Sequence, residues 1–316
     1  MSNLIITTAV GYRPADIWTF LASAARHCPS AEIIAIVHQR DLPALRPCCE
    51  AFPALTLHAI KTPLRPLQHA QGVTYKIRRV MARWRSSLLA RLHHWGWSTQ
   101  LADEQPSFLG LSTQKMFILN RRFFLARRII QSSSPSVSSV LLSDSRDVVF
   151  QSDPFVSLGS GCHTGMEYRT HSDSPINAQW LRSTYGESGY NELHECPVLC
   201  SGVTIGSRRC ILNYLDLFCS EIASVVYAWH SVLIPIWDQA YHNRILRRDP
   251  PAEMVMMPWS SDLATVGEVP SEYLHLDSDG LVSVAGVVPS ILHQYDRHPA
   301  IASAISSSYA MPMALR

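Results

Sequence analysis

The sequence has little net charge and no long apolar run. Its 316 residues include 27 lysines and arginines and 25 acidic residues, for a net charge of +2. A balance this even does not favour nucleic acid as a partner. No uncharged stretch reaches the roughly 20 residues of a membrane-spanning helix. Residues 1–10 are typical of a first strand rather than of a secretory signal. We therefore expect a soluble, cytoplasmic protein.

The cysteines do not follow the paired spacing of a metal knuckle. There are eight of them, and Cys196 and Cys200 are not followed by a second pair at similar spacing. A chain of this length does not need disulfides to fold, so we expect reduced, buried thiols. The sequence also contains no internal repeat and no long low-complexity segment. With 47% hydrophobic and 16% charged residues, it has enough apolar material for a packed core.

Apolar, β-rich runs alternate with helical patterns in the first part of the chain. Strands are expected at residues 4–8, 32–37 and 55–60, with helices from Pro14 onward and over 42–49. Such alternation is typical of parallel βαβ units. We therefore predict an α/β fold of the Rossmann type, with a mixed, mainly parallel sheet flanked by helices.

The rest of the chain predicts further elements of both kinds. These are helices at 76–94, 112–130, 211–227 and 237–247, strands at 140–143 and 200–205, loops and short helices over 156–189, turns and short strands over 258–288, and a polar tail. Between Lys61 and Arg128 basic residues greatly outnumber acidic ones, which indicates either an anionic partner or solvated helix faces. The 76–94 helix either packs on the sheet or contacts a membrane surface.

Two close carboxylates directly follow the apolar strand at 140–143. Asp144 and Asp147 flank Ser145-Arg146, and the chain then becomes apolar again. Ligands of open α/β sheets bind at the carboxyl ends of the strands. Paired carboxylates at such an end can hold Mg²⁺ or Mn²⁺. The alternative is that the two carboxylates cap a turn or pair with Arg146.

Three later motifs carry groups suited to binding or catalysis. Residues 200–206 form a small-residue strand in which Gly202 permits close approach of the backbone to a ligand. Asp238-Gln239 places a carboxylate and an amide on the first turn of a helix, where the acid could instead serve only the helix dipole. His293, after an apolar run, is a candidate metal ligand or a structural histidine.

In this order the four motifs resemble those of glycosyltransferases of the GT-A fold. The segment Asp144-Ser145-Arg146-Asp147 is similar to their Asp-x-Asp metal motif, and the Asp-Gln pair and late histidine resemble retaining families of the glycogenin and galactosyltransferase type. Two positions depart from the pattern. Ser145 stands where the first aspartate of a strict motif would be, so Asp144 is expected to serve instead. Cys200 replaces the usual asparagine.

The resemblance implies one catalytic domain over 1–316, with a nucleotide-binding half (1–155), an acceptor-binding half (156–300) and a tail (301–316). It implies a uridine diphosphate sugar as donor and a glycan or lipid-linked saccharide as acceptor. The basic helix at 76–94, in turn, suggests a lipid-phosphate-linked acceptor and peripheral contact with the inner face of a membrane, as in polysaccharide assembly, and the even overall charge predicts no nucleic-acid partner.

The resemblance also assigns roles to individual residues. Asp144, Asp147 and His293 would hold Mn²⁺ or Mg²⁺. Asp238 would lie near the reacting sugar carbon, with Gln239 on the sugar hydroxyls. The remaining donor contacts are expected from Thr8, Tyr12, Lys115, Arg122, Arg146, Ser201, Gly202 and Arg297.

Two other function classes stay open on the sequence alone. A phosphohydrolase or phosphotransferase could also place two aspartates after a strand, although such enzymes usually carry a nucleophilic aspartate on the first strand, and residues 5–10 contain none. A catalytically inactive nucleotide-sugar-binding module is the other alternative.

Overall fold

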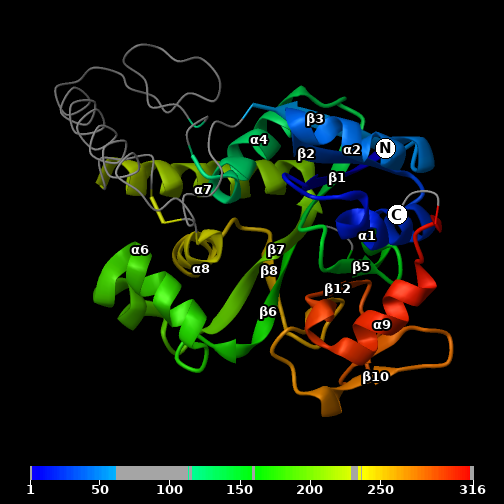
Figure 1. Ribbon diagram of the computed structural model, residues 1–316. Helices are drawn as coiled ribbons and strands as arrows, with labels where there is room; N and C mark the ends of the chain where they lie inside the picture. Colours follow the sequence, from blue (N-terminus) through cyan, green and yellow to red (C-terminus); the bar gives the residue numbers. More distant parts are fainter. Residues whose placement is uncertain are drawn as a thin grey trace, which may run out of the picture.

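The computed structural model describes residues 2–61, 113, 116–158, 161–228, 234–235 and 237–313. Within these residues seven strands form one central sheet (Figure 1). Their order across the sheet is β3 (Leu55–Ile60), β2 (Ala31–His38), β1 (Ser2–Thr8), β4 (Val137–Ser143), β7 (Pro197–Ser207), β6 (Cys162–Thr170) and β8 (Met254–Met257).

The sheet is mostly parallel, with one strand reversed. β1 pairs in parallel with β2 and β4, and β2 with β3. β7 runs antiparallel between β4 and β6, and β6 pairs in parallel with β8. The central strand β1 has four consecutive buried residues, Leu4 to Thr7, because helices cover both faces of the sheet there. The predicted mainly parallel, helix-flanked α/β fold is therefore confirmed.

Two sets of helices cover the two faces of the sheet. Leu4 and Ile6 of β1 pack in one apolar cluster with α4 (Ile118–Ser132) and α7 (Arg208–Ala228). Ile5 of the same strand packs on the opposite side, against α1 (Pro14–His27) and α2 (Leu42–Ala51). Strand residues alternate between faces, so one apolar run serves both clusters.

A smaller sheet joins the middle of the chain to its C-terminal part. β12 (Ile291–His293) lies between β5 (Val148–Phe150), to which it is antiparallel, and β9 (Leu263–Thr265), to which it is parallel. Helix α9 (Pro299–Ser308) packs Ile301 and Ile305 into the core of this sheet. This arrangement carries residue 293 to the segment that follows β4.

The remaining elements complete the second half of the chain. They are the single-turn α5 (Pro154–Ser157), α6 (Pro175–Leu193), α8 (Asp238–Arg248) and the hairpin of β10 (Leu274–Leu276) with β11 (Val282–Val284). Helix α6 is interrupted at Gly186, whose φ of 72° lies outside the helical range.

Three element predictions were wrong. The 156–189 segment contains the nine-residue strand β6 and most of α6 rather than loops and short helices. Residues 299–308 form α9 instead of a polar tail, because Ile301 and Ile305, one turn apart, have a core to pack on. Helix α4 begins at Ile118, six positions later than expected. The predicted strands and helices at 4–8, 32–37, 55–60, 200–205, 211–227 and 237–247 all exist, with slightly different ends.

Among the described helices, none has the length and apolar content needed to cross a bilayer. The predicted basic helix at 76–94 and its membrane contact fall outside the described residues, as does Lys115.

Candidate functional site

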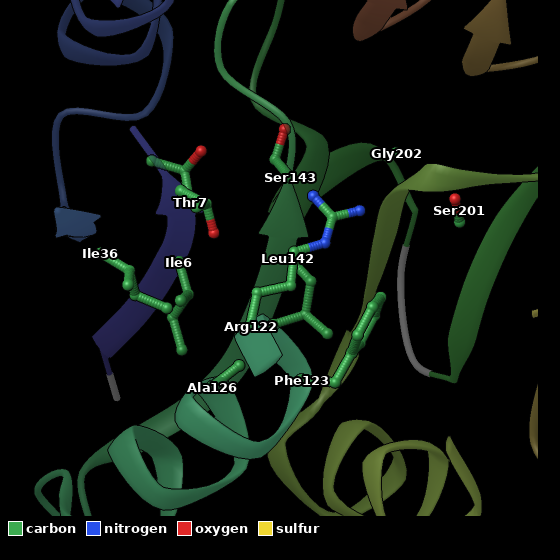
Figure 2. A pocket seen from close by; sticks show the side chains of 11 residues that line it. Ile6, Thr7, Ile36, Arg122, Phe123, Ala126, Leu142, Ser143, Ser201 and Gly202 are labelled. Carbon is green, nitrogen blue, oxygen red and sulfur yellow. The ribbon is translucent and has the colours of Figure 1, made fainter. Parts of the chain in front are cut away.

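Several of the predicted site residues lie where the parallel strands β1 and β4 end next to each other. The chain leaves β1 toward β2 on one side, while β4 lies on the other, which is a switch point in the strand order. Ligands of open α/β sheets bind in the crevice at such a point. Thr7 and Thr8 of β1 and Ser143 of β4 line a cleft there. Figure 2 shows the Arg122 guanidinium reaching from α4 between Ser143 and Ser201.

The cleft itself is small. It has a volume of about 30 Å³, which is enough for a water molecule. A ligand as large as a nucleotide could therefore place only one of its groups in this cleft.

Asp144, Asp147 and His293 meet beside this cleft. Each offers a ligand atom, and these atoms all lie within 4.8 Å of one another. His293 Nε2 is 3.6 Å from Asp147 Oδ2 and 3.9 Å from Asp144 Oδ2. The backbone holds both aspartates in place: Asp144 N–H donates to the Gly202 carbonyl, and Gln294 N–H donates to the Asp147 carbonyl, each at 2.7 Å.

The three groups fit a metal ion on several counts. His293 is 3% exposed. Its Nε2 is buried and has no hydrogen-bond partner within the described part of the chain. Gly202 allows His293 and Asp144 to approach the backbone of β7 closely, because a Cβ there would lie 2.3 Å from His293 Cε1 and 3.0 Å from Asp144 Oδ2. Two carboxylates and one imidazole are common metal ligands. This group could therefore hold a metal ion.

The charges in the cluster favour a protonated His293 and an ionised Asp147. Burial alone would lower the pKa of His293, but neighbouring Cys200 and Asp147 raise it well above its usual value. Burial opposes ionisation of Asp147, yet its pKa is lowered because His293 and the more distant Arg297 favour the carboxylate. Metal binding requires neutral imidazole, so a metal would compete with a proton for His293.

Arg122 joins this cluster to the Asp-Gln motif. One guanidinium nitrogen donates to Asp144 Oδ1, and the other lies 2.7 Å from Asp238 Oδ2. Burial alone would lower the pKa of Arg122, but the two carboxylates raise it above the usual value. Burial raises the pKa of Asp238 even though Arg122 acts in the opposite direction. Arg122 thus neutralises two acids of the site, whereas the sequence predicts a contact with donor phosphate.

Gln239 is held in a buried polar network. Its Nε2 donates to Glu167 Oε1 at 2.9 Å and to Asn177 Oδ1 at 2.7 Å, while its Oε1 accepts from Ser201 N–H at 3.3 Å. Both amide hydrogens of Gln239 therefore already have acceptors within the protein, whereas the sequence predicts that Gln239 binds sugar hydroxyls. Burial raises the pKa of Glu167, which favours its protonated form.

Of the other predicted site residues, some lie at or near the cleft and two are exposed arginines. Thr8, Ser201 and Gly202 line the cleft. Burial, Asp144 and Asp147 together raise the pKa of Tyr12, which places this phenol in the electrostatic field of the two carboxylates.

Arg146 and Arg297 are exposed. Arg146 Nη2 lies 3.9 Å from Asp296. The sequence left open that Arg146 pairs with the two aspartates. Asp144 instead pairs with Arg122. Arg297 assists His293 in lowering the pKa of Asp147, and it opposes the rise that burial causes in the pKa of Glu167.

Two contributors to the site were missed. Asn177, on α6, hydrogen-bonds Gln239, and Thr265, at the end of β9, lies 3.3 Å from His293 Nδ1. Neither belongs to a recognisable motif. A buried polar residue is a signal in a structure, because it needs a partner, but the sequence does not show which residues are buried.

The comparisons with known proteins add no family to this geometry. A scan of the chain against protein-family models finds no match, and a search of curated proteins finds no significant relative.

Proposed function

We propose that this chain is a metal-dependent glycosyltransferase of the GT-A fold. It would move a sugar from a uridine diphosphate sugar to a glycan or lipid-linked saccharide acceptor. The observation that carries the proposal is the grouping of Asp144, Asp147 and His293 at the carboxyl edge of a mostly parallel sheet. Arg122 links this grouping directly to Asp238.

The resident ion of this proposal is Mn²⁺ or Mg²⁺. Two carboxylates and one histidine form a set rich in hard oxygen ligands, which suits these cations. When bound, the ion would neutralise charge on a diphosphate leaving group. The exposed Arg146 and Arg297 are the side chains of the proposal that would carry further phosphate charge, since guanidinium suits bidentate contact with phosphate.

Asp238 and Glu167 are the two candidate catalytic carboxyl groups. Asp238 accepts from Ser201 Oγ at 3.5 Å and is paired with Arg122, so its carboxylate is held in one orientation. If configuration at the sugar is retained, Asp238 would stabilise the positively charged sugar during transfer. If configuration is inverted, a carboxylate must take the proton of the acceptor hydroxyl, and Glu167, which accepts a hydrogen bond from Gln239, would serve in its ionised form.

The alternatives differ in what they require. A phosphohydrolase with its nucleophile on the first strand would need a carboxylate at the end of β1, where Thr7 and Thr8 stand. A sugar-binding module without activity would bind nucleotide whether or not metal is present.

The test is thermal stability against a panel of nucleoside diphosphates and their sugars, with and without Mn²⁺. A ligand that binds only the folded state stabilises it by about 2.7 kcal/mol at a hundredfold excess over Kd. We expect one nucleotide to raise Tm only with Mn²⁺, and Asp147→Ala to abolish the shift. Glu195→Ala, which removes an 88% exposed carboxylate, is the control.

The other outcomes decide between the alternatives. A shift that does not need metal would favour the binding module. No shift with any nucleotide would contradict the proposal and favour other phosphate chemistry.

A further inference from the structure

The ring nitrogen of His293 that faces away from the carboxylates has two polar neighbours. Nδ1 lies 3.2 Å from Cys200 Sγ on β7 and 3.3 Å from Thr265 Oγ1 on β9. All three side chains are buried. The ring is thus held from two strands on one side, while its other nitrogen faces Asp144 and Asp147.

In the neutral imidazole that metal binding requires, these contacts favour one position of the ring proton. The sulfur of Cys200 also lies 3.4 Å from the Gly202 N–H, which donates to it. If Nδ1 carries a proton, the sulfur accepts from two N–H groups and Thr265 Oγ1 can accept as well. Nε2 is then left with its lone pair toward the carboxylates.

The opposite tautomer fits the same contacts poorly. The single lone pair of Nδ1 would have to accept from both the thiol and the hydroxyl. An Nε2–H group would face Asp147 Oδ2 at 3.6 Å, which is longer than a normal hydrogen bond. Of the two neutral tautomers, the one that can bind a metal through Nε2 therefore satisfies the buried contacts better.

We propose that Cys200 and Thr265 are positioning residues for the metal ligand His293. They hold Nδ1–H and so direct the Nε2 lone pair to the metal, as partners of metal-bound histidines commonly do. Cys200 is not itself a ligand, because it contacts the nitrogen opposite Nε2. This inference rests on the proposed metal site, and it gives the cysteine at position 200 a role that needs no contact with substrate.

The test is the dissociation constant of Mn²⁺, measured by electron paramagnetic resonance on the full chain without nucleotide. Cys200→Ala and Thr265→Val each remove one partner of Nδ1. We expect each to weaken Mn²⁺ binding by about 10- to 100-fold. Cys200→Ser and Thr265→Ser keep a polar atom at each position and should recover most of the affinity.

Cys48→Ala is the matched control. Cys48 is a fully buried thiol in the apolar cluster of α1 and α2, so its removal should lower stability without changing the Mn²⁺ Kd. This separates a loss of positioning from a general loss of packing.

The failures of the two proposals can be told apart. If the unaltered protein binds Mn²⁺ and both Cys200→Ala and Thr265→Val bind it equally well, the positioning role is wrong and the metal site stands. The positioning role is also wrong if Cys200→Ser and Thr265→Ser bind Mn²⁺ as weakly as Cys200→Ala and Thr265→Val. If the unaltered protein does not bind Mn²⁺, the metal site is wrong, and the positioning role with it.

Discussion

At the scale of single residues, the candidate metal site depends on a glycine, Gly202, as well as on its three ligand side chains. Gly202 lies on β7 beside His293 and Asp144, and its lack of a Cβ lets both side chains approach the strand closely. Its φ does not lie in the left-handed region, so the reason for glycine here is space rather than backbone conformation.

We predict that Gly202→Ala abolishes Mn²⁺ binding, because the new methyl group would displace His293. The measurement is the same Mn²⁺ titration by electron paramagnetic resonance. Gly206→Ala is the control: it sits on the same strand and would also be crowded, with its Cβ 2.5 Å from the Gly161 carbonyl oxygen. Gly206→Ala should destabilise the fold and keep the metal affinity. Equal affinities of Gly202→Ala and the unaltered protein would refute the placement of the ion.

Arg122 is a second residue whose role follows from its neighbours. Its side chain is 12% exposed and pairs with both Asp144 and Asp238. Removing one partner of a buried ion pair costs roughly 3–5 kcal/mol, because the remaining charge is left without a counterion.

We therefore expect Arg122→Met to lower the free energy of unfolding by roughly that amount, measured by urea denaturation. Adding Asp238→Asn to Arg122→Met should restore part of the loss, since one of the two unpaired charges is then removed. Arg182→Ala breaks an exposed pair with Glu187 and should change stability little. A loss with Arg122→Met as small as with Arg182→Ala would contradict the assigned role.

At the scale of elements, helix α8 is attached to the sheet by a buried histidine. The His242 ring contacts Thr164 Oγ1 of β6 at 3.0 Å and Tyr214 Oη of α7 at 2.8 Å. Burial lowers the pKa of His242 to about 3, with Arg122 and Arg247 acting in the same direction. The same helix begins with Asp238 and Gln239, so its attachment positions the candidate catalytic residues.

This histidine makes stability depend on pH in a defined direction. In the unfolded chain His242 takes up a proton near its ordinary pKa of about 6.5, whereas in the folded protein it stays neutral down to about pH 3. Its contribution to stability is therefore complete above about pH 6.5 and declines by about 1.4 kcal/mol per pH unit as the pH falls below that.

We predict that His242→Gln lowers stability at neutral pH and flattens the decline between about pH 6.5 and pH 5. Urea denaturation over this range measures the slope. Part of the decline should remain, because burial also lowers the pKa of His171, to about 4. A slope in His242→Gln identical to that of the unaltered protein would mean that His242 does not stay neutral in the folded state.

At the scale of the whole molecule, the site depends on parts of the chain that are far apart in sequence. The small sheet places β12 between β5 and β9, and this pairing brings His293 to Asp147. The β-rich runs at 4–8, 32–37 and 55–60 suffice to predict the parallel strands, because their alternation with helical segments is typical of βαβ units. The resemblance carried by the order of the motifs likewise suffices to predict that Asp144, Asp147 and His293 lie close together.

Strand β6 and the partners of Arg122 could not be predicted, because both depend on contacts between residues that are far apart in the sequence. Strand β6 contains His163, Thr164 and Glu167, which are polar yet buried. Thr164 and Glu167 find partners on α8, in His242 and Gln239, and no local pattern announces such partners. Strands this polar look like loops in a sequence. Arg122 was predicted to bind phosphate because its charge is readable from the sequence and its two carboxylate neighbours are not.

The proposed function requires that Asp144, Asp147 and His293 hold a metal ion that would neutralise the charge of a nucleoside diphosphate. Pulsed electron paramagnetic resonance on the protein with Mn²⁺ and UDP tests it directly, because it detects magnetic nuclei close to the manganese. We predict coupling to the nitrogen of His293 and to the phosphorus of UDP in the same sample. His293→Gln should remove the nitrogen coupling. Phosphorus coupling without nitrogen coupling, or manganese in its free aqueous form, would contradict the account.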